Sequence, residues 1–364
     1  QAYWLDDYAL YRALKDYFRG RPWFDWPAAI KTRNPEALVH CRRMLKHDYD
    51  FYKQLQYIFF MQWSKLKRYA NEQNVKILGD MPIFVAHDSA DCWAHQELFQ
   101  LDADGYPEMV AGVPPDYFSP KGQVWGNPLY DWGKLEEEDY DWWQERFRTL
   151  SQFVDEIRID HFRGFASYWS VKRGSDTAAG GEWIPGPGSS FFKAIKRRQP
   201  KLKLVAEDLG VFTPDVGALK DELGLPGMRI LQFHVRERGD GTASLDTEPN
   251  CLVYTGTHDN NTVRGWYEDE LSDGQKQRLC DLLGVSADLP VQQIVAKLVE
   301  YLYSRQAETA ILPMQDVLGL PGTSRMNVPG TATGNWRWQL TQAELEEAIK
   351  KSSWLAELCE RYKR

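Results

Sequence analysis

Two spacings of apolar residues alternate along this chain, one typical of helices and one typical of strands. Between residues 51 and 74 apolar side chains return every three or four positions, which predicts a long amphipathic helix. Short continuous apolar runs predict buried strands at 76–80, 156–160, 202–207, 228–233, 251–257 and 310–313. Further helices are predicted at 142–154, 191–199, from 214, at 291–302 and from 342, where Thr341 and Glu344 form a capping box.

Strands that alternate with helices indicate a parallel sheet. The expected fold class is α/β, a (β/α)8 barrel of the TIM type with inserted helical subdomains. Because only the six strands above are expected, the barrel is predicted to lack its first two, which lie upstream or are supplied irregularly by the opening segment. Residues 1–74 are expected to form a mainly helical subdomain and lead-in. The whole of 1–364 is expected to be one catalytic barrel domain.

The composition allows a globular protein and narrows its partners. Of the 364 residues 43% are apolar, and no run of about 18 apolar residues could cross a bilayer. The formal net charge is −8 without a long single-sign run, which argues against nucleic acid or an anionic membrane surface as the main partner. The 5 scattered cysteines, without a CxxC pair, favour a reducing compartment such as the cytoplasm or a plastid stroma. The net charge is compatible with a neutral polyol as the substrate.

An acidic residue stands at the end of three of the predicted strands. They are Asp160 in EIRIDHFRG, Glu207 in LKLVAEDLG and Asp259 in CLVYTGTHDNNT. Barrel enzymes build their active sites at the carboxyl ends of the strands. Two carboxyl groups about 5–5.5 Å apart break a glycosidic bond with retention when one attacks the anomeric carbon and the other protonates the leaving oxygen. The three acids therefore predict chemistry on a glycosidic bond.

The surroundings of each acid indicate different roles. Arg158 lies two residues before Asp160, so both side chains share one face of the strand, and its cation suits an ionised nucleophile. Glu207 follows three apolar residues, a setting that raises the pKa of an acid/base. Asp259 is expected to stabilise positive charge on the sugar ring, and His258 to hydrogen-bond a sugar hydroxyl.

Each of these residues also has an ordinary structural explanation. A single Asp after a strand is most often a helix cap or a turn residue, and an Arg two residues before an Asp is commonly a salt bridge. The joint occurrence of three acids on successive strand ends favours chemistry. The 7 histidines are scattered, with no HxH pair and no HExxH, so no metal site is expected. The loop GGEWIPGPGSS matches no phosphate-binding or dinucleotide fingerprint.

The strings RIDHFRGF, VAEDLG and YTGTHDNNT together resemble the amylomaltases, or disproportionating enzymes, which are 4-α-glucanotransferases. The resemblance includes GDMPIFVAHDSADCWAHQELF and AGVPPDYFSPKGQVWGNPLYDW, and it extends through LPGMRILQF and ILPMQDVLG to MNVPGTATGNWRWQL. It implies a barrel enzyme that moves α-1,4-glucan segments between maltooligosaccharides or starch-type glucans, with retention, through a covalent glucosyl-enzyme. It implies no cofactor.

By motif the resemblance assigns Asp160 as the nucleophile, Glu207 as the acid/base and Asp259 as the transition-state stabiliser. The implied contacts with the sugar at the cleavage point are Arg158, His258 and Asp80. The positions that match acceptor-side contacts are His161, Asp116, Gln123 and Trp125, and Asn327 matches a further sugar contact. The family also carries an N-terminal segment with the first barrel strand, which this sequence does not contain. The chain is therefore expected to be a fragment, or to have an open barrel with an exposed strand edge.

Residues 111–132 are expected to form an aromatic active-site loop. The string PPDYFSPKGQVWGNP is too rich in Pro and Gly for a helix or a central strand, and it carries Tyr117, Phe118 and Trp125. Flat aromatic side chains suit the apolar faces of sugar rings. A lid of this kind at a barrel mouth would exclude water and thereby favour a sugar acceptor over hydrolysis.

Other functions fit the same acids. A hydrolase of the α-amylase type uses the same chemistry and would only shorten maltotriose, whereas a transferase would also make longer oligomers. A catalytically impaired glucan-binding fragment would bind maltooligosaccharides, and Glu207→Gln would then change no rate. A metal-dependent barrel hydrolase is a third alternative, which insensitivity to chelators would exclude.

Overall fold

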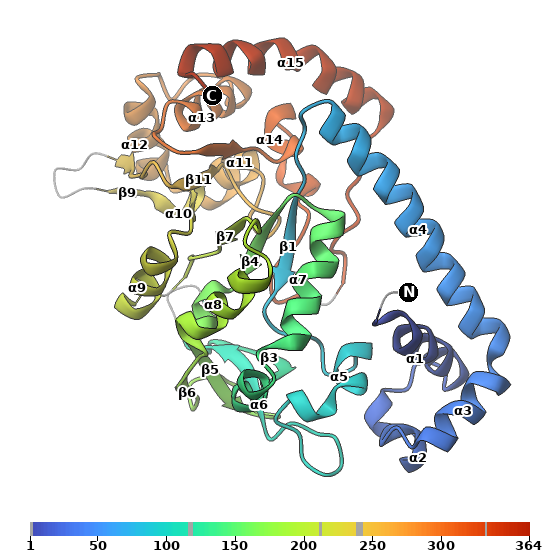
Figure 1. Cartoon of the computed structure of the whole chain (residues 1–364). Helices are drawn as coiled ribbons and strands as arrows, with labels where there is room; N and C mark the ends of the chain where they lie inside the picture. Colours follow the sequence, from blue (N-terminus) through green and yellow to red (C-terminus); the bar gives the residue numbers. More distant parts are fainter. Residues whose placement is uncertain (1–2, 116–118, 211–212, 238–242, 332) are drawn as a thin grey trace. The chain divides into compact units, whose positions relative to one another are not determined.

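The structure is a computed structural model that describes residues 3–115, 119–210, 213–237, 243–331 and 333–364 (Figure 1). Its architecture is α/β, and the chain divides into two compact units, Gln1–Leu225 and Pro226–Arg364. Each unit contains a three-stranded parallel sheet. The candidate acids Asp160 and Glu207 belong to the first unit, and Asp259 belongs to the second.

The first unit begins with a run of helices, drawn in blue in Figure 1. They are α1 (Leu5–Tyr17), the 3-10 helix η1 (Trp23–Asp25), α2 (Ala28–Lys31), α3 (Pro35–Met44) and α4 (Lys46–Glu72). Asn34 begins α3, because its side-chain oxygen accepts hydrogen bonds from the backbone N–H groups of Glu36 and Ala37. Pro35 follows in the first turn, where its missing N–H is not needed. The long helix predicted at 51–74 is confirmed as α4.

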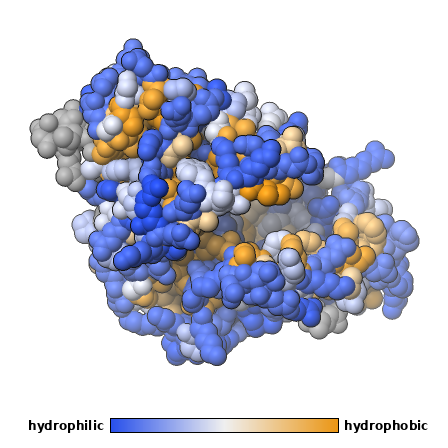
Figure 2. All heavy atoms as spheres, turned by 90° about the horizontal axis from the view of Figure 1, so that it is seen from above, coloured by the Kyte–Doolittle hydropathy of each residue, from blue (hydrophilic) through white to orange (hydrophobic). Residues whose placement is uncertain are grey.

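The apolar stripe that predicted α4 is exposed to solvent. No residue of this helix is buried, and its exposed apolar side chains are Phe51, Leu55, Tyr57, Ile58, Phe59, Phe60, Met61, Leu66 and Tyr69. Polar contacts attach the helix to its unit: Trp63 Nε1 donates to Phe153 O at 2.7 Å, and Lys53 pairs with Asp6 at 2.6 Å. Figure 2 shows that apolar residues reach the surface at several places on the face that it draws.

Three parallel strands in the order β1-β4-β7 organise the first unit. They are β1 (Leu78–Pro82), β4 (Glu156–Asp160) and β7 (Leu204–Ala206). The last two lie within predicted runs, and β1 overlaps the run predicted at 76–80 but continues to Pro82. The helices α7 (Asp141–Phe153) and α8 (Gly188–Arg198) precede β4 and β7, as the apolar pattern predicts. Along β4, Ile157 and Ile159 are buried, so Arg158 and Asp160 lie on the opposite face. In the pairing of β1 with β4, Asp80 lies opposite Arg158.

An antiparallel sheet that the sequence did not predict also belongs to the first unit. Its order is β3-β2-β5-β6, with β2 (Met109–Val113), β3 (Gln123–Pro128), β5 (Ser167–Lys172) and β6 (Glu182–Pro185). Part of the segment 111–132 is therefore an edge strand, where a proline is tolerated because an edge needs fewer N–H donors. Shorter helices of this unit are α5 (Ala90–Ala94), η2 (Gln96–Leu98), α6 (Trp132–Glu137), η3 (Phe162–Phe165) and α9 (Pro214–Leu223).

The second unit is built on the parallel sheet β12-β11-β8. Its strands are β8 (Gly227–Ile230), β11 (Cys251–Tyr254) and β12 (Thr309–Ile311). The strand predicted at 228–233 ends early, at Ile230, and the short helix α10 (Leu231–His234) follows it. Periodicity alone does not separate a short apolar strand from a buried helical turn, which explains this difference. The strands β9 (Val235–Glu237) and β10 (Ala243–Leu245) form a small antiparallel pair.

Helices fill most of the remaining second unit. They are α11 (Val263–Gly265), the π-helix η4 (Trp266–Glu270), α12 (Asp273–Leu283), α13 (Val291–Tyr303), α14 (Met314–Leu318), η5 (Gly322–Ser324) and α15 (Gln342–Tyr362). The predicted capping box of α15 is confirmed, because the side chains of Thr341 and Glu344 each accept a hydrogen bond from the other residue's backbone N–H.

Each unit has a hydrophobic core of its own. The largest fully buried side chains of the first unit are mostly aromatic and include Trp23, Trp93, Trp143, Tyr130 and Phe147. The core of the second unit gathers smaller side chains such as Leu231, Val253, Val263, Ile294 and Leu298. All five cysteines are free thiols. Across the described ranges, no helix combines the length and the apolar character that a bilayer span requires.

Candidate active site

One guanidinium joins two carboxylates at the end of β4. Arg158 Nη1 lies 2.7 Å and 2.8 Å from the two carboxylate oxygens of Asp80 and 3.0 Å from Asp160 Oδ1. The parallel register and the period of two along a strand explain why these side chains meet. Burial opposes the charge on Arg158, but Asp80, Asp160 and Glu207 outweigh that effect and raise its pKa. Arg158 therefore pairs with Asp160, as the spacing predicts.

Glu207 directly follows β7 and lies beside the end of β4. The register aligns Ile159 with Ala206, and Glu207 continues this pairing by donating its backbone N–H to Ile159 O at 3.0 Å. Its carboxylate accepts two backbone hydrogen bonds of 2.8 Å, Oε2 from His161 N and Oε1 from Leu209 N. Asp160 and Glu207 thus occupy neighbouring positions on adjacent parallel strands, which lie about 4.8 Å apart in sheets.

The environment of Glu207 raises its pKa to about 7. Removal of the carboxyl group from water is the main cause, and the negative charge of Asp160 adds to it. Arg158 and the two backbone N–H groups act in the opposite direction, because they favour the carboxylate. A carboxyl group with a pKa near neutrality can both donate and accept a proton at moderate pH.

His161 links this cluster to the edge strand β3. Its backbone is left-handed, with φ of 51°, and this turns its N–H toward the carboxylate of Glu207. Its ring lies 4.8 Å from the ring of Trp125, edge to face. Burial, followed by the charge of Arg163, lowers the pKa of His161 to about 3, so the imidazole is neutral. Within the part of the chain that the structure describes, its buried Nε2 has no hydrogen-bond partner.

The expected acceptor-side residues meet at the same place, as far as they are described. Trp125 Nε1 donates to Gln123 Oε1 at 3.1 Å, and Trp125 in turn contacts His161. Trp125 keeps 38% of its surface exposed. The remaining acceptor-side residue, Asp116, lies outside the described residues, as do Tyr117 and Phe118 of the expected aromatic loop.

The second unit holds its own cluster in the loop after β11. Asn327 Nδ2 donates to Asp259 Oδ1 at 2.6 Å, and His258 Nε2 lies 3.4 Å from Asp259 Oδ2. The backbone is fixed as well, because Asn327 N donates to His258 O at 3.1 Å and Arg325 Nη2 donates to Asp259 O at 2.6 Å. The structure therefore brings together the three expected site residues of the second unit, His258, Asp259 and Asn327.

Trp336 belongs to this second cluster and was missed in the sequence. Its ring centre lies 5.1 Å from that of His258, and 62% of its surface is exposed. Its backbone is left-handed, with φ of 60°, and its N–H donates to Met326 O at 2.8 Å. The signal was present as GNW, a tryptophan placed directly after a Gly-Asn turn in the string with Asn327.

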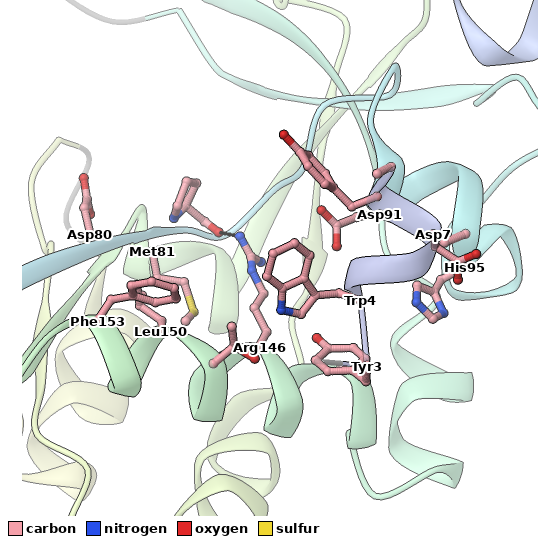
Figure 3. A pocket seen from close by; sticks show the side chains of 15 residues that line it. Tyr3, Trp4, Asp7, Asp80, Met81, Asp91, His95, Arg146, Leu150 and Phe153 are labelled. Atoms are coloured by element: carbon pink, nitrogen blue, oxygen red, sulfur yellow. Dashed lines mark hydrogen bonds between the residues drawn. The ribbon is translucent and has the colours of Figure 1, made fainter. Parts of the chain in front are cut away.

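A pocket of about 310 Å³ opens beside β1 in the first unit (Figure 3). Asp80 lies at one end, apolar side chains of β1 and α7 form its floor, and Tyr3 and Trp4 lie at the other end. Arg146 reaches up from α7 and donates from Nη2 to Pro82 O at 2.7 Å. Neither candidate acid of this unit lines the pocket, so it meets the cluster at β4 only through Asp80.

Metal-binding geometry is absent from the described ranges, which contain no group of three or more His, Cys, Asp or Glu side chains that could hold an ion. The two clusters themselves offer carboxyl groups, a guanidinium, and imidazole and amide hydrogen bonds.

Known proteins resemble this chain over nearly its whole length. A family model described as 4-alpha-glucanotransferase matches residues 1–344. The 4-alpha-glucanotransferase of Synechocystis sp. is 46% identical over 351 residues, which cover 95% of this chain and 69% of that protein. The chloroplastic/amyloplastic 4-alpha-glucanotransferase of Arabidopsis thaliana is 42% identical over 351 residues, which cover 96% of this chain and 60% of that protein.

Solved structures agree with these relatives. The amylomaltase from Streptococcus agalactiae in complex with acarbose superposes with a TM-score of 0.92 at 37% identity, over 99% of this chain and 72% of that chain. The amylomaltase from Corynebacterium glutamicum shares the fold, with a TM-score of 0.70 at 20% identity over 95% of this chain and 52% of that chain.

Proposed function

This chain belongs to the 4-alpha-glucanotransferase family, and on that premise we propose that Asp160, Glu207 and Asp259 carry its reaction. The protein is a 4-alpha-glucanotransferase of the amylomaltase, or disproportionating, type that acts on α-glucans. The family and the activity expected from the sequence resemblance are thereby confirmed. The proposed donors and acceptors are maltooligosaccharides or starch-type α-glucans.

In the proposed reaction two bonds are exchanged at one anomeric carbon. Asp160 attacks that carbon while protonated Glu207 gives its proton to the leaving glycosidic oxygen, so the donor is cleaved and a glucosyl ester forms on Asp160. The 4-hydroxyl of an acceptor then gives its proton to Glu207 and attacks the same carbon, which releases Asp160. Two inversions give net retention, and both acids return to their starting state.

The observation that carries this proposal is the contrast between two neighbouring carboxyl groups. Asp160 accepts a hydrogen bond from Arg158 at 3.0 Å, an arrangement that suits a nucleophile. Glu207, at the adjacent strand end, is half-buried and has a pKa raised to about 7, which suits an acid/base. The spacing of adjacent strands, about 4.8 Å, is close to the separation of about 5–5.5 Å that a retaining pair needs.

Asp259 is proposed to stabilise the positive charge that develops on the sugar ring. Asn327 donates a hydrogen bond to one of its oxygens and His258 Nε2 lies 3.4 Å from the other, which supports a fixed orientation of the carboxylate. Arg158, Asp80 and His258 are proposed to contact the sugar at the cleavage point, and Asn327 is proposed as a further sugar contact. His161, Asp116, Gln123 and Trp125 are proposed to contact the acceptor, and Trp336 offers a further exposed ring for a sugar face.

We also propose that both parallel sheets are parts of one (β/α)8 barrel and that 1–364 acts as a single catalytic domain, with 1–74 as its helical subdomain. The order β1-β4-β7 and the order β8-β11-β12 support this, because each follows the chain with helices between strands. The segment 111–132, which contains the edge strand β3, is proposed to border the active site with Tyr117, Phe118 and Trp125. Five free thiols support a reducing compartment, the cytoplasm or a plastid stroma.

The proposal is tested by profiling the products that the protein makes from maltotriose. A transferase yields glucose and longer oligomers with little net gain of reducing ends. Asp160→Asn, Glu207→Gln and Asp259→Asn are each expected to lower the rate by about 10³-fold or more. Glu137→Gln, an exposed acid on α6, is the matched control and keeps the parent rate.

The same profile separates the alternatives. A steady gain of reducing ends without longer oligomers would indicate a hydrolase. Activity of Asp160→Asn equal to that of the parent would remove this residue from the mechanism. Unchanged rates in all three acid variants would leave only glucan binding.

A further inference from the structure

The loop that carries Asp259 connects β11 to α11 and spans residues 255–262. Hydrogen bonds within the loop fix the conformation of its middle: Asn260 Oδ1 accepts from both N and Oγ1 of Thr257, each at 2.9 Å. These internal contacts do not hold the loop to the rest of its unit. Arg325 and Asn327 hold the part around Asp259 from outside the loop, and the path of the loop also depends on what fixes its two ends.

A single buried carboxylate holds both ends. Asp316 lies on α14 and is 2% exposed. Its Oδ2 accepts from Thr255 Oγ1 at 2.5 Å, where β11 has just ended, and its Oδ1 accepts from Val263 N at 2.7 Å, where α11 begins. The two oxygens of one side chain thus clamp the start and the end of the loop.

We propose that Asp316 is a positioning residue for glucan transfer: its carboxylate clamps the loop 255–262 so that Asp259 and His258 are held in their working orientation. This inference rests on the proposed role of Asp259. Asp316 does not touch substrate and acts only through the loop. A catalytic group must be held within a fraction of an ångström of its productive position. A loop that is fixed at both ends as well as at its middle meets this demand better than one fixed at its middle alone.

The chemistry of the clamp explains why the residue is an aspartate. Both partners, the Thr255 hydroxyl and the Val263 N–H, are donors, and an ionised carboxylate is the side chain that offers only acceptors. Burial works against this choice and raises the pKa of Asp316 to about 6, while the hydrogen bonds from Thr255 and Val263 oppose the shift. An apolar side chain at this position would avoid the cost of desolvation but would leave both loop ends without their partner.

The test removes one half of the clamp with the smallest possible change. Thr255→Val deletes the hydroxyl and keeps the shape, whereas Thr255→Ser keeps the hydroxyl. We expect Thr255→Val to lower kcat on maltotriose roughly 10-fold with KM within about twofold, and Thr255→Ser to restore kcat. Asp316→Ala, which opens both ends, is expected to lower kcat roughly 100-fold. Hydrogen exchange of the Val263 amide should accelerate in Asp316→Ala, because its acceptor is lost.

Two controls separate positioning from stability and from the role of Asp259. Val299→Ala removes volume from the hydrophobic cluster of Val299, Tyr303 and Leu358, which includes no residue of the loop 255–262, and is expected to lower the free energy of unfolding while kcat stays at the parent value. Parent kcat in Thr255→Val, equal losses in Thr255→Val and Thr255→Ser, or an equal loss in Val299→Ala would overturn the inference.

If Asp259→Asn keeps parent activity, the proposed function of Asp259 fails; if it is inactive while Thr255→Val is unaffected, only the clamp fails. Should Asp316→Ala not fold, the pair of Thr255 variants decides.

Discussion

Glu207 sets the pH range in which its carboxyl group can start the reaction. The first step needs the protonated acid, and burial, with help from Asp160, raises its pKa to about 7. Below this value the proton is present, and above it the proton is lost. We therefore expect kcat/KM for maltotriose to fall above about pH 7, approaching roughly tenfold per pH unit at higher pH. Initial rates of glucose release from about pH 5 to about pH 9 measure this.

The control for this assignment is the titration of Glu207 itself. In Asp160→Asn the neighbouring negative charge is gone, so the pKa of Glu207 should move down, toward its usual range. Carbon NMR of labelled glutamate in this inactive variant follows the shift directly. A rate that stays flat from about pH 6 to about pH 9, or a pKa that does not respond to Asp160→Asn, would contradict the role given to Glu207.

Single residues were predicted from sequence where the cause is local. The spacing of Arg158 and Asp160 predicted their ion pair, and the apolar run before Glu207 predicted the direction of its pKa shift. Trp336 and Asp316 were not found, because their contacts join segments far apart in the chain. Asp316 and Thr255, for example, are separated by 61 positions, and no local pattern reports such a hydrogen bond.

At the scale of elements, Gly79 lets β1 lie close to the residue that follows α7. A Cβ atom at this position would lie 2.6 Å from Val154 Cγ1, so the side chain of Val154 would have to move. We expect Gly79→Ala to lower the free energy of unfolding by about 1–3 kcal/mol, measured by urea denaturation. Asp80 follows directly in β1, so kcat should fall as well.

A second variant shows whether this steric contact is the cause. Val154→Ala removes the methyl groups that a new Cβ would strike, and the double variant should be more stable than the sum of the two single losses predicts. Strict additivity of Gly79→Ala and Val154→Ala would place the cost elsewhere.

The edge strand β3 carries the aromatic ring that is expected to keep water from the reacting sugar. Trp125 is 38% exposed and lies against His161, next to Glu207. Trp125→Ala is expected to raise the share of hydrolysis in the product mixture several-fold, because water then competes better with the sugar acceptor. The measurement is the ratio of new reducing ends to glucose released from maltotriose.

The matched control lies on the same antiparallel sheet. Trp183 on β6 is exposed to nearly the same extent, 37%, but its ring is stacked on the guanidinium of Arg163 at 3.7 Å. Trp183→Ala should leave the product ratio unchanged. An equal rise of hydrolysis in both variants, or no rise in Trp125→Ala, would show that β3 does not control water access.

Parallel strands and antiparallel strands differed in how well the sequence revealed them. The strands of both parallel sheets were predicted from short runs rich in apolar residues, and the run is continuous where both faces are buried, as in β11. The antiparallel sheet was missed because Gly, Pro and polar residues interrupt its strands, as in GQVWGNP, and such a pattern is also typical of loops. The sequence also did not predict that the apolar stripe of α4 is exposed, because periodicity shows that a helix has an apolar face but not what covers that face.

At the scale of the whole molecule, charge should matter little for the capture of substrate. The protein carries a formal net charge of −8, while a glucan is neutral, so no long-range attraction or repulsion steers their encounter. The ion pairs of Arg158 are short and half-buried, and salt screens such pairs weakly. We expect KM for maltotriose to change by less than about twofold between about 50 mM and about 500 mM sodium chloride.

An anionic, carboxymethylated oligosaccharide is the control: the acidic protein repels it, so its KM should fall as salt rises. A steep salt dependence with the neutral substrate would mean that charged surface residues bind the glucan directly, which would move the substrate contacts away from those proposed here.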